Sequence, residues 1–212
     1  MRGFFVFFLI LLMGRTNGQS QNDYGFLPKV ILSKKYGERL RWINSAESRT
    51  DLNKDATLNN NLLDLSSILS YRADVHHTLN FGYIIRFEGG EVIHRTFQHF
   101  NYLQEFSASQ LSHRFAFEQF FEPNKSLFFR GRYRAMFQKP LNGERVDVKE
   151  FYIKLGNEYL WNFEDKELEI RFTPYLGYQL STKDRIEFGI DYRTLSFDQN
   201  NFWFRTTWYI SI

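Results

Sequence analysis

Residues 128–138 read FFRGRYRAMFQ, and their side chains fall into two alternating sets. From Phe129 onward, one set holds Phe129, Gly131, Tyr133, Ala135 and Phe137, and the other holds Arg130, Arg132, Arg134, Met136 and Gln138. Successive side chains of a β-strand point to opposite faces of its sheet, so this alternation predicts a strand with one largely apolar face and one cationic face. The fold depends on which of these two faces meets water.

The same alternation recurs along most of the chain and is broken by polar turns such as Gly89-Gly90. We predict strands in ten segments: 39–49, 62–72, 78–88, 93–105, 111–121, 127–138, 148–161, 167–180, 185–195 and 202–212. An eleventh segment, 26–34, is doubtful because Pro28 lacks the N–H group that a central strand donates. Single-chain bacterial barrels have even strand numbers, which favours ten strands, or twelve if 26–34 pairs and another strand has been missed.

Three features of these segments favour a barrel that crosses a membrane. Their length of about 10 to 14 residues exceeds the usual length of a globular strand and suits a tilted crossing of a bilayer. Their polar face is rich in Arg and Glu rather than Lys, which suits ion pairing in a confined space. Aromatic residues gather near strand ends, as at 120–121 and 202–204, and such rings sit well at a membrane interface. We therefore predict an all-β fold, an antiparallel up-and-down transmembrane β-barrel over residues 39–212, with its apolar face toward lipid.

The two ends of the chain point to export. Arg2 followed by the apolar run 4–13 reads as a cleaved signal peptide over residues 1–18, because the run is too short to cross a bilayer as a helix. Residues 19–38 form an N-terminal segment that could add a strand. The last residues, NFWFRTTWYISI (201–212), alternate to the end of the chain. This is typical of a closing strand that the barrel-assembly machinery recognises, although such strands usually end in an aromatic residue. We expect a protein of the bacterial outer membrane, in contact with its lipid.

The composition excludes several kinds of function. Cysteine is absent, so disulfides and thiolate metal sites are impossible. The formal net charge of +3 falls to +1 without residues 1–18, which argues against a nucleic-acid partner. His94 and His99 have a spacing that places them on opposite faces of a strand, so we expect neither a metal site nor a cofactor. The adjacent Ser112 and His113 likewise point to opposite faces, and no GxSxG motif occurs in the chain.

An ordered series of motifs resembles a known family. The series is YRADVHHTLNFGY (71–83), HRTFQ (94–98), HRFAFEQFF (113–121), FRGRYRAMFQKPL (129–141), GNEYLW (156–161) and IRFTPYLGYQLSTKDRIEFGIDY (170–192). It is similar to the DUF2490 family of exported bacterial proteins, which are regarded as outer-membrane barrels and lack an assigned activity. The resemblance covers roughly residues 39–212 and implies a fold and a compartment, but no reaction. The matching polar positions are Arg95, Arg114, Glu118, Arg130, Arg132, Glu158 and Arg171, and Phe120 departs from the family pattern, which favours a further Arg there.

The polar face supplies the candidate site. We predict that a network in the barrel lumen is formed by Arg114, Glu118, Arg130, Arg132, Arg134, Glu158 and Arg171. The interior of such a narrow barrel is expected to be largely filled by side chains, and charges there must be paired or hydrated. The network is then either a set of salt bridges that holds the barrel together or a binding site or narrow path for a small anionic ligand.

Three functional hypotheses follow. The first is an outer-membrane β-barrel, more readily non-enzymatic, with a structural, binding or narrow transport role. The second is an outer-membrane enzyme that modifies lipid, which requires a Ser and a His to meet across adjacent strands. The third is a soluble periplasmic lipocalin-like barrel that binds an apolar ligand, which requires the Phe and Leu faces to point inward.

Overall fold

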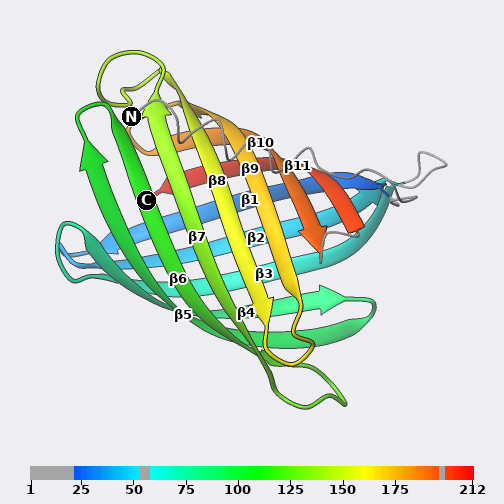
Figure 1. Cartoon of the computed structure of the whole chain (residues 1–212). Helices are drawn as coiled ribbons and strands as arrows, with labels where there is room; N and C mark the ends of the chain where they lie inside the picture. The colour runs from blue at the N-terminus through cyan, green and yellow to red at the C-terminus, as the bar shows by residue number, and fades with distance from the viewer. Residues whose placement is uncertain (1–21, 53–57, 196–198) are drawn as a thin grey trace.

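The chain forms a closed β-barrel of eleven strands over the residues that the structure, a computed structural model, describes: 22–52, 58–195 and 199–212 (Figure 1). In chain order the strands are β1 (Asn22–Tyr36), β2 (Leu40–Leu52), β3 (Leu58–Arg72), β4 (His77–Glu88), β5 (Glu91–Phe106), β6 (Ser109–Phe121), β7 (Phe128–Pro140), β8 (Phe151–Asn162), β9 (Leu168–Gln179), β10 (Asp184–Leu195) and β11 (Gln199–Ser211). The predicted all-β barrel is confirmed, while the predicted signal peptide, residues 1–18, lies outside the described residues. None of the described segments is a helix with the length and apolarity needed to cross a bilayer.

Every strand pairs antiparallel with the strand that precedes it, and the parallel pairing of β1 with β11 closes the barrel. All ten predicted strands are present as β2 to β11, and the doubtful segment 26–34 belongs to β1. Chain direction reverses at each turn, so the first and the last of eleven strands must run the same way. The even number of strands expected from bacterial barrels is therefore wrong for the described chain, although odd numbers do occur among membrane barrels.

Pro28 is tolerated inside β1 because the ladder is interrupted beside it. The register of β1 with β2 pairs Phe26 with Thr50 and resumes at Lys29 with Glu47, leaving Leu27 and Pro28 outside the antiparallel pairing. The missing N–H of the proline therefore leaves no gap in an otherwise continuous ladder on that side. The expectation that proline disfavours a central strand holds locally, and the strand forms around it.

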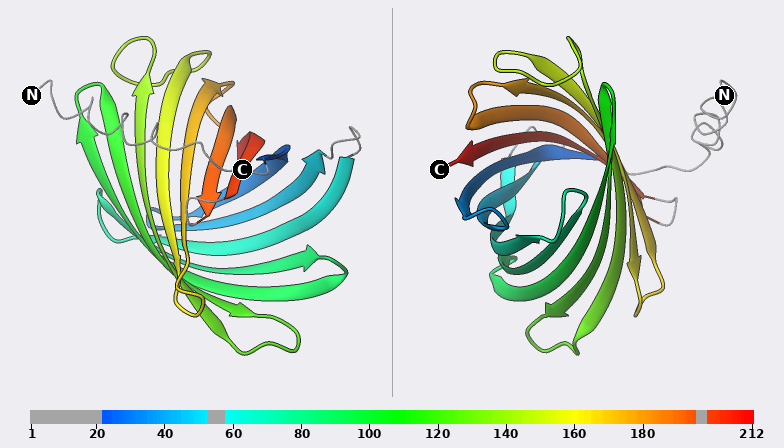
Figure 2. Two further views of the ribbon diagram at one scale, coloured as in Figure 1. Left: turned by 45° about the vertical axis from the view of Figure 1, so that its right-hand side comes forward. Right: turned by 90° about the vertical axis from the view of Figure 1, so that its left-hand side faces the viewer.

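The sheet is strongly tilted, and some of its strands are joined by short turns. Figure 1 shows β7 to β9 on the near wall crossing β1 to β3 on the far wall at a large angle, and Figure 2 shows the same sheet curving round to close. Tilt of this kind is required when a sheet closes on itself. The predicted turn between β4 and β5 is made by Gly89 and Gly90, with φ angles of 60° and 84°. A two-residue hairpin of this type needs positive φ at both positions, which glycine adopts without strain.

The apolar face of the sheet points outward. Phe81, Phe188 and Trp208 expose 56%, 52% and 44% of their surface, whereas inward-facing carboxylates such as Glu118 and Glu187 are almost fully buried. A soluble lipocalin-like barrel needs the opposite arrangement. The orientation predicted from the alternation, with apolar side chains outside and the Arg/Glu face inside, is the one that the structure has.

Aromatic rings strengthen both sides of the wall. On the outer face, Tyr24 stacks on Phe202 with ring centroids 5.9 Å apart across the parallel seam. On the inner face, the ring of Phe97 lies over Gly82 so closely that a Cβ atom there would overlap it. A glycine covered by a cross-strand aromatic ring is a known device for fixing strand register and curvature. Phe97 itself is only 3% exposed, so it forms part of the small apolar core inside the barrel.

Candidate functional site in the barrel lumen

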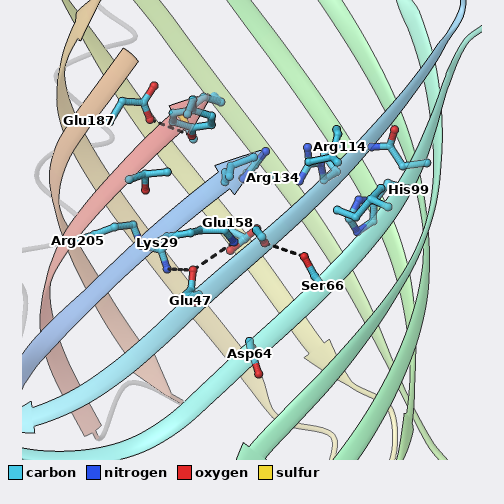
Figure 3. Close-up of a pocket in the computed structure, with 18 of the residues that line it drawn as sticks. Lys29, Glu47, Asp64, Ser66, His99, Arg114, Arg134, Glu158, Glu187 and Arg205 are labelled. Atoms are coloured by element: carbon cyan, nitrogen blue, oxygen red, sulfur yellow. Dashed lines mark hydrogen bonds and ion pairs between the residues drawn. The ribbon is translucent and has the colours of Figure 1, made fainter. Parts of the chain in front are cut away.

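The barrel encloses a cavity of about 750 Å³. Small inward residues such as Ser45, Ser66 and Ser112 line it together with long charged side chains (Figure 3). The lumen is therefore less completely filled than expected from the sequence, because eleven strands surround a wider interior and several inward positions carry small residues. A volume of this size is within the range of ligand pockets.

Positive charge is concentrated in this cavity. Its lining contains fifteen Lys or Arg residues, twelve of them arginine, and six Asp or Glu residues. The six acidic residues are Glu47, Asp64, Glu118, Glu158, Glu169 and Glu187. The lining thus carries nine more positive than negative charges, and the surplus is seven once Glu88 and Asp191, which ion-pair with lining arginines from outside the lining, are counted. The formal net charge of the whole chain is only +3. The fold segregates cations into the lumen because the polar positions of the alternating strands all face inward.

The centre of the ion-pair network is the carboxylate of Glu118 on β6. Arg130 Nη2 lies 2.6 Å from its Oε2 atom, and Arg132 Nη1 donates to Oε1 at 3.0 Å. Arg95 approaches from β5 at 4.0 Å. Glu118 is 1% exposed, and a buried carboxylate needs such partners to remain charged at low cost. Three arginines from two neighbouring strands therefore hold this one carboxylate.

Arg132 on β7 extends the network to the next two strands. Its Nε and Nη2 atoms lie 2.8 and 2.9 Å from the two carboxylate oxygens of Glu158 on β8. Arg171 on β9 lies 3.8 Å from Glu158 and donates from Nε to Glu169 at 2.5 Å. The result is a continuous chain of alternating charges that crosses four adjacent strands. The fork of Arg132 contacts two carboxylates at once, which a lysine ammonium could not do in the same geometry.

The seven predicted site residues all line the cavity, but they do not form a single network. Five of them, Glu118, Arg130, Arg132, Glu158 and Arg171, belong to the chain of ion pairs. Arg114 and Arg134 do not, since neither is ion-paired to a carboxylate among the described residues. Arg114 instead donates from Nε to Asn101 Oδ1 at 2.7 Å.

A second cluster surrounds Glu187 on β10. Its carboxylate accepts hydrogen bonds from Tyr152 at 2.7 Å, from Lys154 at 2.9 Å and from Tyr209 at 3.1 Å. Tyr209 lies on β11, which is adjacent to β10, whereas Tyr152 and Lys154 lie on β8, which is separated from β10 by β9. Sequence reasoning placed Glu187 on the polar face but did not include this cluster in the site. The alternation places Lys154 and Tyr209 on the same inward face as Glu187, but a single sequence does not show which strands lie close enough for their side chains to bind each other.

Two further acidic groups anchor other parts of the wall. Asp64 on β3 accepts two hydrogen bonds from Arg86 on β4, both at 2.8 Å. Asp191 on β10 lies 2.9 Å from Arg193 and 3.1 Å from Arg205 on β11. The bidentate pair of Arg86 with Asp64 is the strongest geometry that such groups adopt. Ion pairs are thus distributed around the whole circumference of the lumen.

Phe120 stands where the family pattern favours an arginine, and two arginine side chains lie over its ring. It points into the barrel, is 5% exposed and stacks on Phe128 with centroids 4.4 Å apart. The guanidinium carbon atoms of Arg130 and Arg95 lie 4.7 and 5.2 Å from its ring centroid. Cation–π contact supports both arginines at this position. One more arginine there would add a positive charge to a cluster already rich in cations.

The histidines and serines behave as their spacing predicts. His94 is exposed on the outer face, where its Nδ1 atom lies 2.6 Å from Tyr83 Oη, while His99 points inward. Ser112 lines the cavity, and His113 hydrogen-bonds Tyr133 at 2.8 Å. No serine hydroxyl hydrogen-bonds a histidine in the described part of the chain. Among residues 22–52, 58–195 and 199–212, no three His, Asp or Glu side chains are grouped so that they could hold a metal ion.

Comparison with known proteins identifies the family. Residues 25–204 match the family described as "Protein of unknown function (DUF2490)". The chain belongs to the DUF2490 family. This match begins within β1 and ends within β11, so it includes most of the first strand, which lies before the region where the motifs resemble the family.

Among solved structures, the DUF2490 barrel is similar to an anion-selective porin from Comamonas acidovorans. The similarity has a TM-score of 0.42 and 11% sequence identity, and it covers 79% of this chain and 55% of the porin. The DUF2490 chain therefore aligns with about half of the porin's length. No curated protein matches the DUF2490 sequence.

Proposed function

We propose that this protein is an outer-membrane β-barrel that binds small anions in its lumen and provides a narrow path for them. The observation that carries the proposal is the surplus of seven positive charges that remains around a cavity of about 750 Å³ after Glu88 and Asp191 are counted as partners of lining arginines. A network that served only to hold the barrel together would need about as many carboxylates as cations, because unpaired charge in a confined space is costly. The surplus is balanced most simply by anions that enter the lumen.

The outer face supports the membrane part of the proposal. Large apolar side chains are exposed around the barrel, among them Trp42, Phe81, Phe115, Phe188 and Trp208. Contiguous apolar surface of this extent is unfavourable in water and matches the lipid-facing band of a membrane barrel. The surrounding lipid is then the first partner of the protein. We also propose that the barrel-assembly machinery recognises the alternating strand β11.

The ion-pair network has a supporting role in this proposal. Glu118 and Glu158 each hold arginines from neighbouring strands in fixed positions, and Glu169 holds Arg171 on its own strand, β9. Fixed guanidinium groups give an anion a preorganised environment instead of one that must rearrange on binding. The structural and the binding interpretations of the network are thus two aspects of one arrangement. The lipid-modifying alternative has no specific observation in its favour.

Ion selectivity tests the proposal directly. The full chain, refolded and inserted into a planar lipid bilayer, is placed between two concentrations of KCl, and the reversal potential is measured. A cationic lumen predicts a reversal potential with the sign of preferential chloride passage. Cation preference in an inserted barrel would contradict the proposal, and so would a protein that stays in the aqueous phase without detergent.

A further inference from the structure

Two arginines face each other across neighbouring strands without a carboxylate between them. Arg114 on β6 is directly opposite Arg134 on β7 in the antiparallel register, and both line the cavity. Like charges directly opposite each other destabilise a sheet. Neither guanidinium has an ion-pair partner in the part of the chain that the structure describes. The positive charge of this pair is therefore balanced only by longer-range attraction to Glu158 and not by an ion pair among the described residues.

The neighbouring strand explains why the pair has no ion-pair partner. Glu158 on β8 lies directly across from Arg134 and would be its natural partner. Both oxygens of that carboxylate are instead held by Arg132, at 2.8 and 2.9 Å. Arg114 donates its Nε atom to Asn101, so its terminal nitrogens, Nη1 and Nη2, remain available to the cavity. The network thus fixes the neighbours of the pair without neutralising the pair itself.

His99 provides a second, independent observation at the same place. It is 8% exposed, lines the cavity and stacks on Phe97 with ring centroids 4.3 Å apart. Its buried Nδ1 atom has no hydrogen-bond partner among the described residues. His99 is paired with Ala116 in the register of β5 and β6, which makes Arg114 its diagonal neighbour on the inner face, and Figure 3 shows the two side chains close together. A buried polar nitrogen without a partner is costly, so a polar group bound beside it would be stabilising.

We propose that Arg114, Arg134 and His99 form a subsite for a small oxyanion, such as a phosphate group or a carboxylate group. Guanidinium forks bind both groups through pairs of charge-assisted hydrogen bonds, and an imidazole N–H can add a further donor. An oxyanion placed between the arginines removes their mutual repulsion and gives their free nitrogens partners. The inference rests on the proposed function, which it deepens by naming the place and the class of ligand.

Calorimetric titration of inorganic phosphate into the refolded full chain in detergent micelles, at constant chloride, tests the subsite. Arg134→Gln and Arg114→Gln each remove one guanidinium, and Arg41→Gln is the matched control. Arg41 lines the same cavity, and it too has no ion-pair partner among the described residues. We expect each subsite variant to weaken phosphate binding by about tenfold or more, as the loss of a charge-assisted hydrogen bond implies. We expect the control to change it by less than about twofold.

The outcomes separate the subsite from the proposed function. Equal weakening by Arg41→Gln and Arg134→Gln would show a diffuse charge effect and overturn the subsite, as would a wild-type chain that binds no phosphate. A parallel titration with acetate shows whether a carboxylate uses the same arginines. An anion-selective barrel without phosphate binding leaves the proposed function intact and removes the subsite. Phosphate binding that depends on Arg134, in a barrel without anion selectivity, would leave the subsite intact and contradict the proposed anion path.

A folding control keeps the test decisive. Each variant is checked for the shift in SDS gel migration between unheated and boiled samples that a folded barrel gives. Arg134 makes no hydrogen bond or ion pair among the described residues, so its replacement by Gln removes repulsion and should leave the fold intact. If Arg114→Gln fails to fold because its bond to Asn101 is lost, Arg134→Gln alone decides the outcome.

Discussion

Replacing Arg132 by alanine should destabilise the barrel more than any other single change in the lumen network. Arg132 is the link between Glu118, at 3.0 Å, and Glu158, at 2.8 and 2.9 Å. Without it, Glu118 keeps Arg130 at 2.6 Å, whereas Glu158 keeps only Arg171 at 3.8 Å. The loss therefore falls mainly on Glu158, whose carboxylate loses both of its contacts below 3 Å and keeps only the longer-range attraction of Arg171 and Arg134.

The expected magnitude follows from the burial of these groups. Removing one partner of a buried ion pair costs about 3 to 5 kcal/mol, because the other charge is left uncompensated. The side chain of Arg132 is 19% exposed and that of Glu158 is 12% exposed to the cavity, so water recovers part of this cost. We expect a loss of about 3 kcal/mol for Arg132→Ala. The control Arg41→Ala removes the same group from a position without an ion pair, and its loss should stay below about 0.5 kcal/mol.

Denaturant titration of the refolded barrel, followed by tryptophan fluorescence, measures both losses. A double-mutant cycle with Glu158→Gln isolates the pair, and we expect a coupling energy between Arg132 and Glu158 of about 1 to 3 kcal/mol. The same cycle with Glu187, in the separate cluster, should give a coupling near zero. A loss for Arg132→Ala no larger than that of Arg41→Ala, combined with altered conductance of the inserted barrel, would refute the structural part of the reasoning.

Three other predictions test separate features of the barrel. Gly82→Ala forces a Cβ atom into the ring of Phe97 and should lower the unfolding free energy by about 1 to 3 kcal/mol. The control Gly131→Ala, whose Cβ atom would lie 3.3 Å from the nearest ring atom, should lower the unfolding free energy much less. Equal losses for the two variants would contradict the packing argument. Arg134→Gln should raise the unfolding free energy by about 0.5 kcal/mol through relief of like-charge repulsion, so a loss of stability in the same denaturant titration would show an overlooked contact. Hydrogen bonds from the His77 ring and from two backbone N–H groups lower the pKa of Asp74, in the turn between β3 and β4, from 3.8 to about 2. The stabilising contribution of the Asp74 carboxylate should therefore be complete above about pH 4 and disappear as the pH falls toward 2. A stability difference between wild type and Asp74→Ala that does not shrink over this pH range would exclude this contribution.

Much of the architecture could be predicted from the alternation alone. The apolar stripe of 129–137 and the cationic stripe of 130–134 give the orientation of the wall, because side-chain parity is a local property of a strand. The turn at Gly89-Gly90 follows from local backbone chemistry in the same way. Pro28 misled the strand count, because the interruption of the ladder that accommodates it depends on the partner strand β2.

The pairing inside the lumen could be predicted only in part. Parity places Arg132, Arg134 and Glu158 on one face, but the direct cross-strand neighbour of Glu158 is Arg134, and the residue that binds it is Arg132. Long side chains reach diagonal positions, so register alone does not decide which ion pairs form. The hydrogen bond from Tyr152 to Glu187 joins β8 and β10, which are separated by β9, and the sequence gives no measure of that separation. Curvature of the closed sheet brings these groups together.

The central claim is that lipid surrounds the phenylalanine-rich face while the arginine-rich face encloses an aqueous lumen. The chain has no cysteine, so single-cysteine variants at Phe188 and at Ser112 report on one face each when the refolded barrel in liposomes is treated with a charged, water-soluble thiol reagent. The account predicts rapid modification of Ser112→Cys, in the lumen, and protection of Phe188→Cys by the bilayer. Protection of Ser112→Cys together with rapid modification of Phe188→Cys would contradict it.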